Sequence, residues 1–275
     1  MTEQLAPAGV AGDIPDPAAG RSALLARKAW RRVAAPLALA LIWESATRLR
    51  LVDPLFLPPL SSVLADFAEL VVTGEFFEHL FPSLNRALQG YAIAVVLGVP
   101  GGFLFGWSRI AREYMGSVIE IMRPVPPISL IPLAILWLGI GDLSKIGIIA
   151  WACFWPIFLN STLGVQSINP IFIKSARNME IHGVRFFTKI LLPAALPQVF
   201  TGLRISLAIA FIVLVAAEMV GADRGLGYLI LESERMFRSP RMFVGIFSIA
   251  MIGYLLNEIL LFFERRLFAY REEIN

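Results

Sequence analysis

The chain has 275 residues, of which 57% are hydrophobic and only 16% are charged, and its mean hydropathy is +0.71. Soluble domains contain about a quarter charged residues, so this composition excludes an ordinary soluble protein and indicates an integral membrane protein. The net charge of +3 is small and dispersed, and it therefore does not indicate a nucleic-acid-binding protein.

The N-terminal part differs from the rest of the chain. Residues 1–28 are rich in Ala, Pro and Gly and have few large side chains, so we predict a disordered tail. We expect no signal peptide, because no apolar segment precedes the basic pair Arg27-Lys28. Residues 29–275 are predicted to form one transmembrane domain.

Long apolar runs in this domain predict an all-α fold, because a helix needs about 20 mainly apolar residues to cross a bilayer. The first predicted span is short and contains Glu44. Before the second span, Ser61 is predicted to cap an amphipathic helix over residues 62–72 that lies outside the bilayer. The six predicted spans are residues 33–47, 84–107, 121–140, 145–166, 193–220 and 242–263.

The basic residues predict how these spans are oriented. Segments 1–32, 108–114, 166–190 and 265–275 contain 14 Lys and Arg, whereas the segments on the other side, 48–80, 139–145 and 221–241, contain 7. Cytoplasmic loops have the excess of basic residues, so both termini are predicted to be cytoplasmic. The segment 221–241 is an exception with four Arg.

In this orientation the basic, amphipathic segment 168–190 faces the cytoplasm. Asn169-Pro170 is typical of a helix start, because Asn caps a helix and Pro suits its first turn. Ile171, Lys174 and Asn178 then share one face. Periodicity alone is also compatible with a surface helix whose basic side chains snorkel at the lipid interface.

The sequence KSARNMEIHGVRFFTKILLP resembles the EAA loop of ABC-importer permeases, which reads EAA-x3-G-x9-I-x-L-P. Ile190, Leu192 and Pro193 match the I-x-L-P end, and Ala176 matches the second alanine. Three more segments resemble, in the same order, the nitrate, sulfonate, taurine and bicarbonate branch of these permeases, and the resemblance covers nearly the whole chain from Pro58. These segments are RPVPPISLIPLAILWLGIG, LLPAALPQVFTGLRIS and AAEMVGADRGLGYLI.

The resemblance implies a type I ABC-importer-like core in a multi-pass permease subunit of the bacterial inner membrane. Its implied partners are membrane lipid, a second permease copy in a homodimer, two cytoplasmic ATPase subunits and an external solute-binding protein. ATP and Mg would bind the ATPase, and we expect no cofactor and no enzymatic activity in this chain. The sequence has no G-x-x-x-x-G-K-[ST] phosphate-binding motif.

The branch implies a small oxyanion or sulfonate as the solute, such as nitrate, bicarbonate, taurine or an alkanesulfonate. Relatives in the same branch leave a thiamine precursor, riboflavin or an aromatic carboxylate as alternatives. A different class of protein, an ATPase-independent secondary transporter or channel, would leave the 168–190 loop as an inert linker.

The resemblance assigns two roles within this loop. The residues implied to dock on the ATPase are Lys174, Ser175, Ala176, Arg177, Asn178, Met179, Glu180 and Gly183. The residues implied to form a hinge into the fifth span are Ile190, Leu192 and Pro193.

Three residues of the loop depart from the family pattern: Lys174 replaces Glu, Ser175 replaces Ala and Glu180 replaces Gly. A Glu held in a left-handed conformation costs about 1–2 kcal/mol. We therefore predict that the first loop helix continues through Glu180 to about His182 and turns at Gly183. A cation near a helix start is mildly unfavourable, so Lys174 predicts an acidic contact on the ATPase.

Polar side chains inside the spans are candidates for the solute path, because each costs about 2.5–3.5 kcal/mol at a helix centre if it is charged. For Arg204 and Glu218 the alternatives are interfacial snorkelling or an ion pair between helices. Prolines close to Ser129 are predicted to kink the third span. The candidates are Arg86, Ser129, Asn160, Arg204 and Glu218.

Other reactive residue types indicate no further site. His79 and His182 are predicted to lie in different loops, so we expect no metal site. Cys153, the only cysteine, lies in an apolar run and is predicted to be a small buried hydrophobe.

Overall fold

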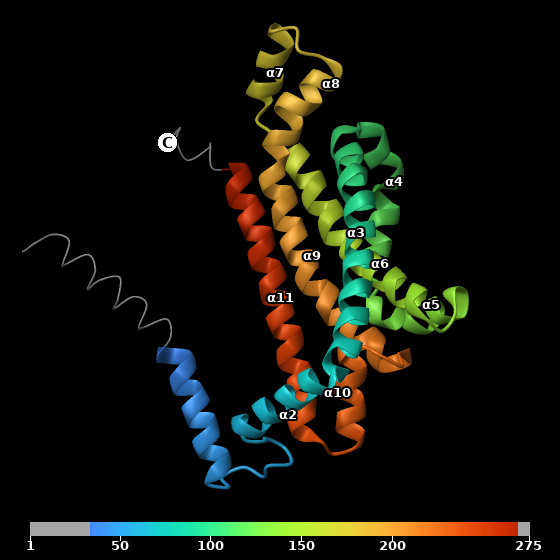
Figure 1. The fold of residues 1–275 in the computed structure, drawn as a ribbon. Coiled ribbons are helices and arrows are strands. Elements are labelled where there is room, and N and C mark those ends of the chain that lie inside the picture. Colours follow the sequence, from blue (N-terminus) through green and yellow to red (C-terminus); the bar gives the residue numbers. More distant parts are fainter. Residues whose placement is uncertain (1–33, 269–275) are drawn as a thin grey trace, which may run out of the picture. The chain divides into compact units, whose positions relative to one another are not determined.

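The computed structural model of the chain describes residues 34–268 (Figure 1). Every regular element in this range is a helix, which confirms the all-α prediction for it. The predicted tail over residues 1–28 lies outside the described residues. The chain divides into two compact units, residues 1–61 and residues 62–275, and each is described by itself.

The described part of the first unit contains a helix over residues 34–48, where the first span is predicted. The prediction that Ser61 is a helix N-cap is wrong, because α2 (Leu60–Thr73) begins one residue before it. The Ser61 backbone N–H donates to Glu44 Oε2 at 3.2 Å, and its hydroxyl donates to Oε1 at 2.7 Å. The Glu44 carboxylate thus satisfies a free N–H of the first turn, as a cap would.

The second unit is a bundle built on α3 (Glu75–Trp107), α6 (Asp142–Gln166) and α9 (Leu192–Gly221). α6 crosses behind α3 in Figure 1 and packs against both α3 and α9. α11 (Ser239–Phe268) packs against α9 and against the shorter α10 (Leu226–Arg235). α3, α6, the helix that includes α9, and α11 are each long and apolar enough to cross a membrane.

The predicted third span is not a continuous helix. The chain forms α4 (Arg109–Met122), a short 3-10 turn (Pro127–Leu130) and α5 (Ile131–Leu138), with a bend of 85° between the two parts. Pro124, Pro126 and Pro127 have no N–H to donate, and each disfavours helical geometry in the residue before it. The kink that these prolines predict in the third span is thus present, and it divides the span into two separate helices. Together α4 and α5 form a fifth candidate span.

Glycines on α3 allow α6 to approach closely. A Cβ at Gly102 would lie 2.5 Å from the carbonyl oxygen of Phe158, which no side chain permits. The Thr162 hydroxyl donates to the Gly102 carbonyl at 3.2 Å. Between helices in lipid there is little hydrophobic driving force, so close packing and hydrogen bonds of this kind hold the helices together.

The core of the second unit lies where α3, α6 and α9 meet. Ile149, Ile157 and Leu214 have no exposed surface there. The Ser206 hydroxyl of α9 donates to the Cys153 carbonyl of α6 at 2.9 Å, and Cys153 is buried as predicted. The described residues thus contain four helices that are long and apolar enough to span a membrane, and one bent pair that is a fifth candidate. The first predicted span, over 33–47, and the orientation of the spans remain predictions.

Candidate functional site

The loop predicted at residues 168–190 forms a projecting structure at one end of the second unit (Figure 1). Its first helix, α7 (Pro170–Asn178), begins where the Asn-Pro pair predicts. The Asn169 side-chain oxygen accepts a hydrogen bond from the Ile171 N–H at 2.9 Å, which satisfies a donor of the first turn. The prediction of a helix start at Asn169-Pro170 is therefore confirmed.

The predicted end of this helix is wrong. α7 ends at Asn178, and Glu180 has a φ of 56°, in the left-handed region. The Ile181 N–H donates to the Ala176 carbonyl at 3.0 Å, a bond that closes the helix end as in a Schellman motif. Gly183 also has a positive φ, 61°, but it begins the next helix and does not end the first.

The physical reason for this difference is the hydrogen bonding of the helix end. The last carbonyls of a helix have no partner within the helix. A Schellman turn supplies N–H donors to them, as the Ile181 N–H does for the Ala176 carbonyl. The turn requires a left-handed residue at position 180, and Glu180 accepts that conformation at a cost of about 1–2 kcal/mol. The conformational cost that we expected the chain to avoid is therefore incurred at Glu180, because the turn does not move to Gly183.

The outer surface of α7 is exposed and mixed in character. Ile171, Phe172 and Met179 are all more than 60% exposed, whereas Ala176 is buried. Lys174, Ser175 and Asn178 are exposed beside them. Large exposed apolar side chains on a polar, projecting helix are typical of a surface that binds another protein.

The loop returns to the bundle without a break in the helix. α8 (Gly183–Phe186) continues through a π-helical turn (Phe187–Leu191) directly into α9. Pro193 has no N–H and its ring clashes with the carbonyl four residues earlier, which favours a widened turn just before it. The predicted hinge residues Ile190, Leu192 and Pro193 thus lie at the junction of this turn with α9; the hinge role itself stays a prediction.

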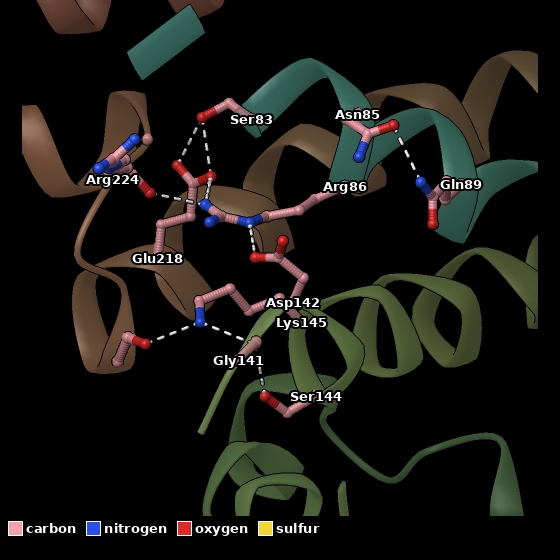
Figure 2. A network of polar contacts seen from close by, with 12 residues as sticks. Ser83, Asn85, Arg86, Gln89, Gly141, Asp142, Ser144, Lys145, Glu218 and Arg224 are labelled. Carbon is pink, nitrogen blue, oxygen red and sulfur yellow. Dashed lines mark hydrogen bonds and ion pairs between the residues drawn. The ribbon is translucent and has the colours of Figure 1, made fainter. Parts of the chain in front are cut away.

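At the opposite end of the second unit, charged side chains from three helices form a network whose centre is buried (Figure 2). Arg86 of α3 forms an ion pair with Glu218 of α9 at 2.7 Å, and their side chains are 4% and 0% exposed. Arg86 also pairs with Asp142, at the start of α6, at 2.6 Å. Arg86 therefore joins α3, α6 and α9, which the sequence does not predict.

The network also holds the segment that connects α9 to α10. The Ser83 hydroxyl lies within 2.8 Å of both Glu218 oxygens and accepts a hydrogen bond from the Leu226 N–H. The Gly227 N–H donates to Glu218 Oε2 at 2.9 Å. A Cβ at Gly225 would lie 2.4 Å from Glu218 Oε1, so this position requires glycine. The carboxylate is thus completely surrounded by hydrogen-bond donors and by the arginine.

Two further side chains extend the network. Lys145 donates to the carbonyls of Gly141 at 2.9 Å and Gly221 at 2.7 Å, and it lines a polar cavity of about 530 Å³ (Figure 2). His79 lies in α3, not in a loop as predicted, and its Nδ1 accepts a hydrogen bond from the Gly225 N–H at 3.3 Å. Both residues therefore bind backbone at the same connecting segment.

The other path candidates lie apart from this network. Arg204 forms an ion pair with Glu264 of α11, and its side chain is 43% exposed. Asn160 donates to the Pro156 carbonyl of its own helix, and the exposed Ser129 donates to the Pro126 carbonyl. The structure thus brings together Arg86 and Glu218 but not Ser129, Asn160 or Arg204.

Sequence reasoning missed Ser83, Asp142 and Lys145 as members of the network. Ser83 resembles any small residue in an apolar run, and Asp142 and Lys145 resemble the boundary of a span. One available signal was the charge of Arg86 and Glu218, because a buried charge requires a partner of opposite sign. These charges predict that Arg86 and Glu218 pair, but they do not predict that Asp142 of α6 joins the pair.

Comparison with known proteins identifies the fold and the family. Residues 94–269 match the family described as "Binding-protein-dependent transport system inner membrane component". The chain is 34% identical over 236 residues to SsuC of Bacillus subtilis, named as an aliphatic sulfonates transport permease, with 86% of each chain covered. It is also 34% identical over 241 residues to the taurine transport system permease protein TauC of Escherichia coli, covering 86% of this chain and 88% of TauC.

Among solved structures, the chain is similar to an inward-facing MetNI methionine ABC transporter. The TM-score is 0.59 at 19% identity, with 70% of this chain and 95% of that chain covered. At this identity the similarity establishes the fold alone, which is that of a type I ABC-importer permease. The family match and the two relatives confirm the resemblance to sulfonate and taurine permeases, so this chain belongs to the family of binding-protein-dependent transport system inner membrane components.

Proposed function

We propose that this chain is the permease subunit of an ATP-driven importer that carries a small sulfonate or related oxyanion across the bacterial inner membrane. Two copies would form the path, an external solute-binding protein would deliver the solute, and two cytoplasmic ATPases, with ATP and Mg, would drive it. Both termini would be cytoplasmic, and residues 29–275 would form the permease domain.

The observation that supports ATPase coupling is the loop at residues 168–190. It projects from the bundle, exposes Ile171, Phe172 and Met179, and returns after a short turn at residues 179–182 through α8, which runs into α9 without leaving helical structure. A partner bound to α7 would therefore act on a spanning helix through one short turn and the helix that begins at Gly183. Rigid-body movement of helices is the usual form of such transitions.

The solute class is supported by the relatives and not by a binding site in this chain. The names of SsuC and TauC assign them to aliphatic sulfonates and taurine, and both share 34% identity with this chain over 86% of its length. Arg86, the buried cation among the path candidates, is neutralised by Glu218 and Asp142. We therefore assign no anion-binding role to Arg86, and the solute class stays a proposal from similarity.

The docking surface can be tested by cross-linking, because the only native cysteine, Cys153, is buried. Met179→Cys places a thiol on the loop, and Ile140→Cys, which is 83% exposed at the opposite end of the unit, is the matched control. The permease is co-expressed with its ATPase partner and treated with a maleimide that carries a photoreactive benzophenone, which couples to the introduced thiol and, on illumination, to a neighbouring protein. We expect a cross-link to the ATPase from Met179→Cys and none from Ile140→Cys.

The solute is tested separately, in vesicles that contain the complete complex. ATP-dependent uptake of taurine or an alkanesulfonate, competed by the other, would support the proposal, whereas uptake only of an uncharged or aromatic solute would contradict the solute class. Solute flux through the permease alone, without an ATPase, would instead establish a secondary transporter or channel. In that case no specific cross-link at Met179→Cys is expected.

A further inference from the structure

An apolar groove lies where α3 ends and the 168–190 loop returns to the bundle. Its volume is about 440 Å³, and it extends along the last two turns of α3 from Pro100 to Trp107. Phe186 and Phe187 line its other side. Trp107 contacts Phe186 at a ring distance of 5.4 Å, and Phe103 contacts Phe187 at 5.6 Å, so paired aromatic rings form its floor.

The groove is open to the surroundings of the bundle. Leu104 is 67% exposed, Trp107 is 51% exposed and Phe187 is 40% exposed. At the end of a spanning helix, such surface lies at the boundary between hydrocarbon and headgroups, where Trp is enriched. A lipid acyl chain is therefore the simplest apolar group that reaches it.

Basic side chains lie close to the groove, and they differ in the partners that they have. Arg109 pairs with Glu113 at 2.7 Å, and Arg112 keeps its charge but is turned onto the carbonyls of Phe105 and Gly106 at the end of α3. Arg185 and Lys189 are exposed, and within residues 34–268 neither has a carboxylate partner. They are four residues apart, so both lie on one flank of the helix whose Phe186 and Phe187 line the groove.

We infer that this groove binds an anionic phospholipid, with an acyl chain against Trp107 and Phe187 and the phosphate-bearing headgroup beside Arg185 and Lys189. The apolar lining alone would accept any lipid, and the exposed cations of Arg185 and Lys189, which have no carboxylate partner within residues 34–268, supply the preference for negative charge. Such a lipid would touch both α3 and the helix that connects α7 to α9. The site is independent of which solute the permease transports.

The inference can be tested by quenching of tryptophan fluorescence with brominated lipids, which requires contact with the acyl chain. The full-length chain is placed in nanodiscs of phosphatidylcholine that contain increasing amounts of brominated phosphatidylglycerol or brominated phosphatidylcholine. The signal of Trp107 is the difference between the wild type and Trp107→Phe, which keeps an aromatic ring in the groove. Two cations near the surface contribute about five-fold each, so we expect up to roughly 30-fold stronger quenching by the anionic lipid.

A double variant provides the decisive comparison. Arg185→Gln with Lys189→Gln should reduce the preference for brominated phosphatidylglycerol to a few-fold or less. Arg265→Gln with Arg266→Gln removes two exposed cations at the same end of the bundle, on α11, and should leave the preference intact. Equal quenching by both lipids in the wild type, or equal loss in both double variants, would overturn the inference. Absence of any Trp107 quenching would show that protein, such as a second copy of the chain, covers the groove.

Discussion

The buried ion pair of Arg86 and Glu218 permits a quantitative prediction. Replacing Arg86 by Met keeps a long, flexible side chain but leaves the Glu218 carboxylate, which has no exposed surface, without a cation. Ser83 and the Gly227 N–H would remain as its hydrogen-bond donors. Removing one partner of a buried pair costs about 3–5 kcal/mol, because the remaining charge stays desolvated.

Two features of the structure place the expected loss within this range and not below it. Arg86 also pairs with Asp142 and donates to the Arg224 carbonyl at 2.7 Å, so the Met variant loses contacts with α6 and with the segment before α10. The assay is reversible unfolding in mixed micelles of a mild detergent and dodecyl sulfate, followed by the change in helix content. We expect the free energy of unfolding to fall by about 4 kcal/mol.

The chain contains its own control for this prediction. Arg204 forms an ion pair with Glu264, but its side chain is 43% exposed, so Arg204→Met should cost only about 0–1 kcal/mol. The companion variant Glu218→Gln should recover part of the stability when it is combined with Arg86→Met, because no unpaired carboxylate then remains buried. A loss below 1 kcal/mol for Arg86→Met, or a loss equal to that of Arg204→Met, would refute this reasoning.

Three further predictions follow from single positions. Glu180→Gly should stabilise the turn after α7 by about 1 kcal/mol, seen as roughly five-fold greater hydrogen-exchange protection of its amides; unchanged protection would contradict the assigned left-handed strain. Gly102→Ala should lower the free energy of unfolding by about 1–3 kcal/mol, because its Cβ meets the Phe158 carbonyl, whereas Gly116→Ala, with nothing within 4 Å, should not lower it. Lys174→Glu should reduce ATP-dependent transport with the native ATPase by up to about five-fold if that partner offers an acidic contact; increased transport would show that it does not.

The fold was predictable to the extent that hydrophobicity determines it. The spans at 84–107, 145–166, 193–220 and 242–263 all lie within helices of the structure, because a long apolar run in a membrane protein has few other solutions. The third span was predicted as one span with a proline kink, and the structure divides it into two helices, since apolar composition continues through Pro124 and Pro127 while backbone hydrogen bonding does not. Hydropathy reports burial in lipid and is insensitive to a missing N–H.

The sites were less predictable, for a different physical reason. The start of α7 follows from two adjacent residues, Asn169 and Pro170. Its end depends on which turn best satisfies the last carbonyls of the helix. Conformational preference alone predicted a turn at Gly183, whereas the structure has it at Glu180. In the same way, the charges of Arg86 and Glu218 mark them as unusual, but their pairing requires three helices in register. Local signals thus identify the residues, and only packing identifies their partners.

The two ends of the second unit are joined by one helical path, and this bears on how the proposed importer would work. The helix from Gly183 to Gly221 contains both the return from the loop and Glu218, about 50 Å apart at 1.5 Å per residue. Its far end is held by Arg86, which also pairs with Asp142 of α6, so Arg86 links α3, α6 and α9. A movement that an ATPase applied at α7 would then shift these three helices together, and the π-helical turn before Pro193 is where the same connection has irregular hydrogen bonding to absorb a change of angle. In the proposed importer, the network around Arg86 would keep α3, α6 and α9 together as one moving body, and the π-helical turn would be the joint between that body and the loop.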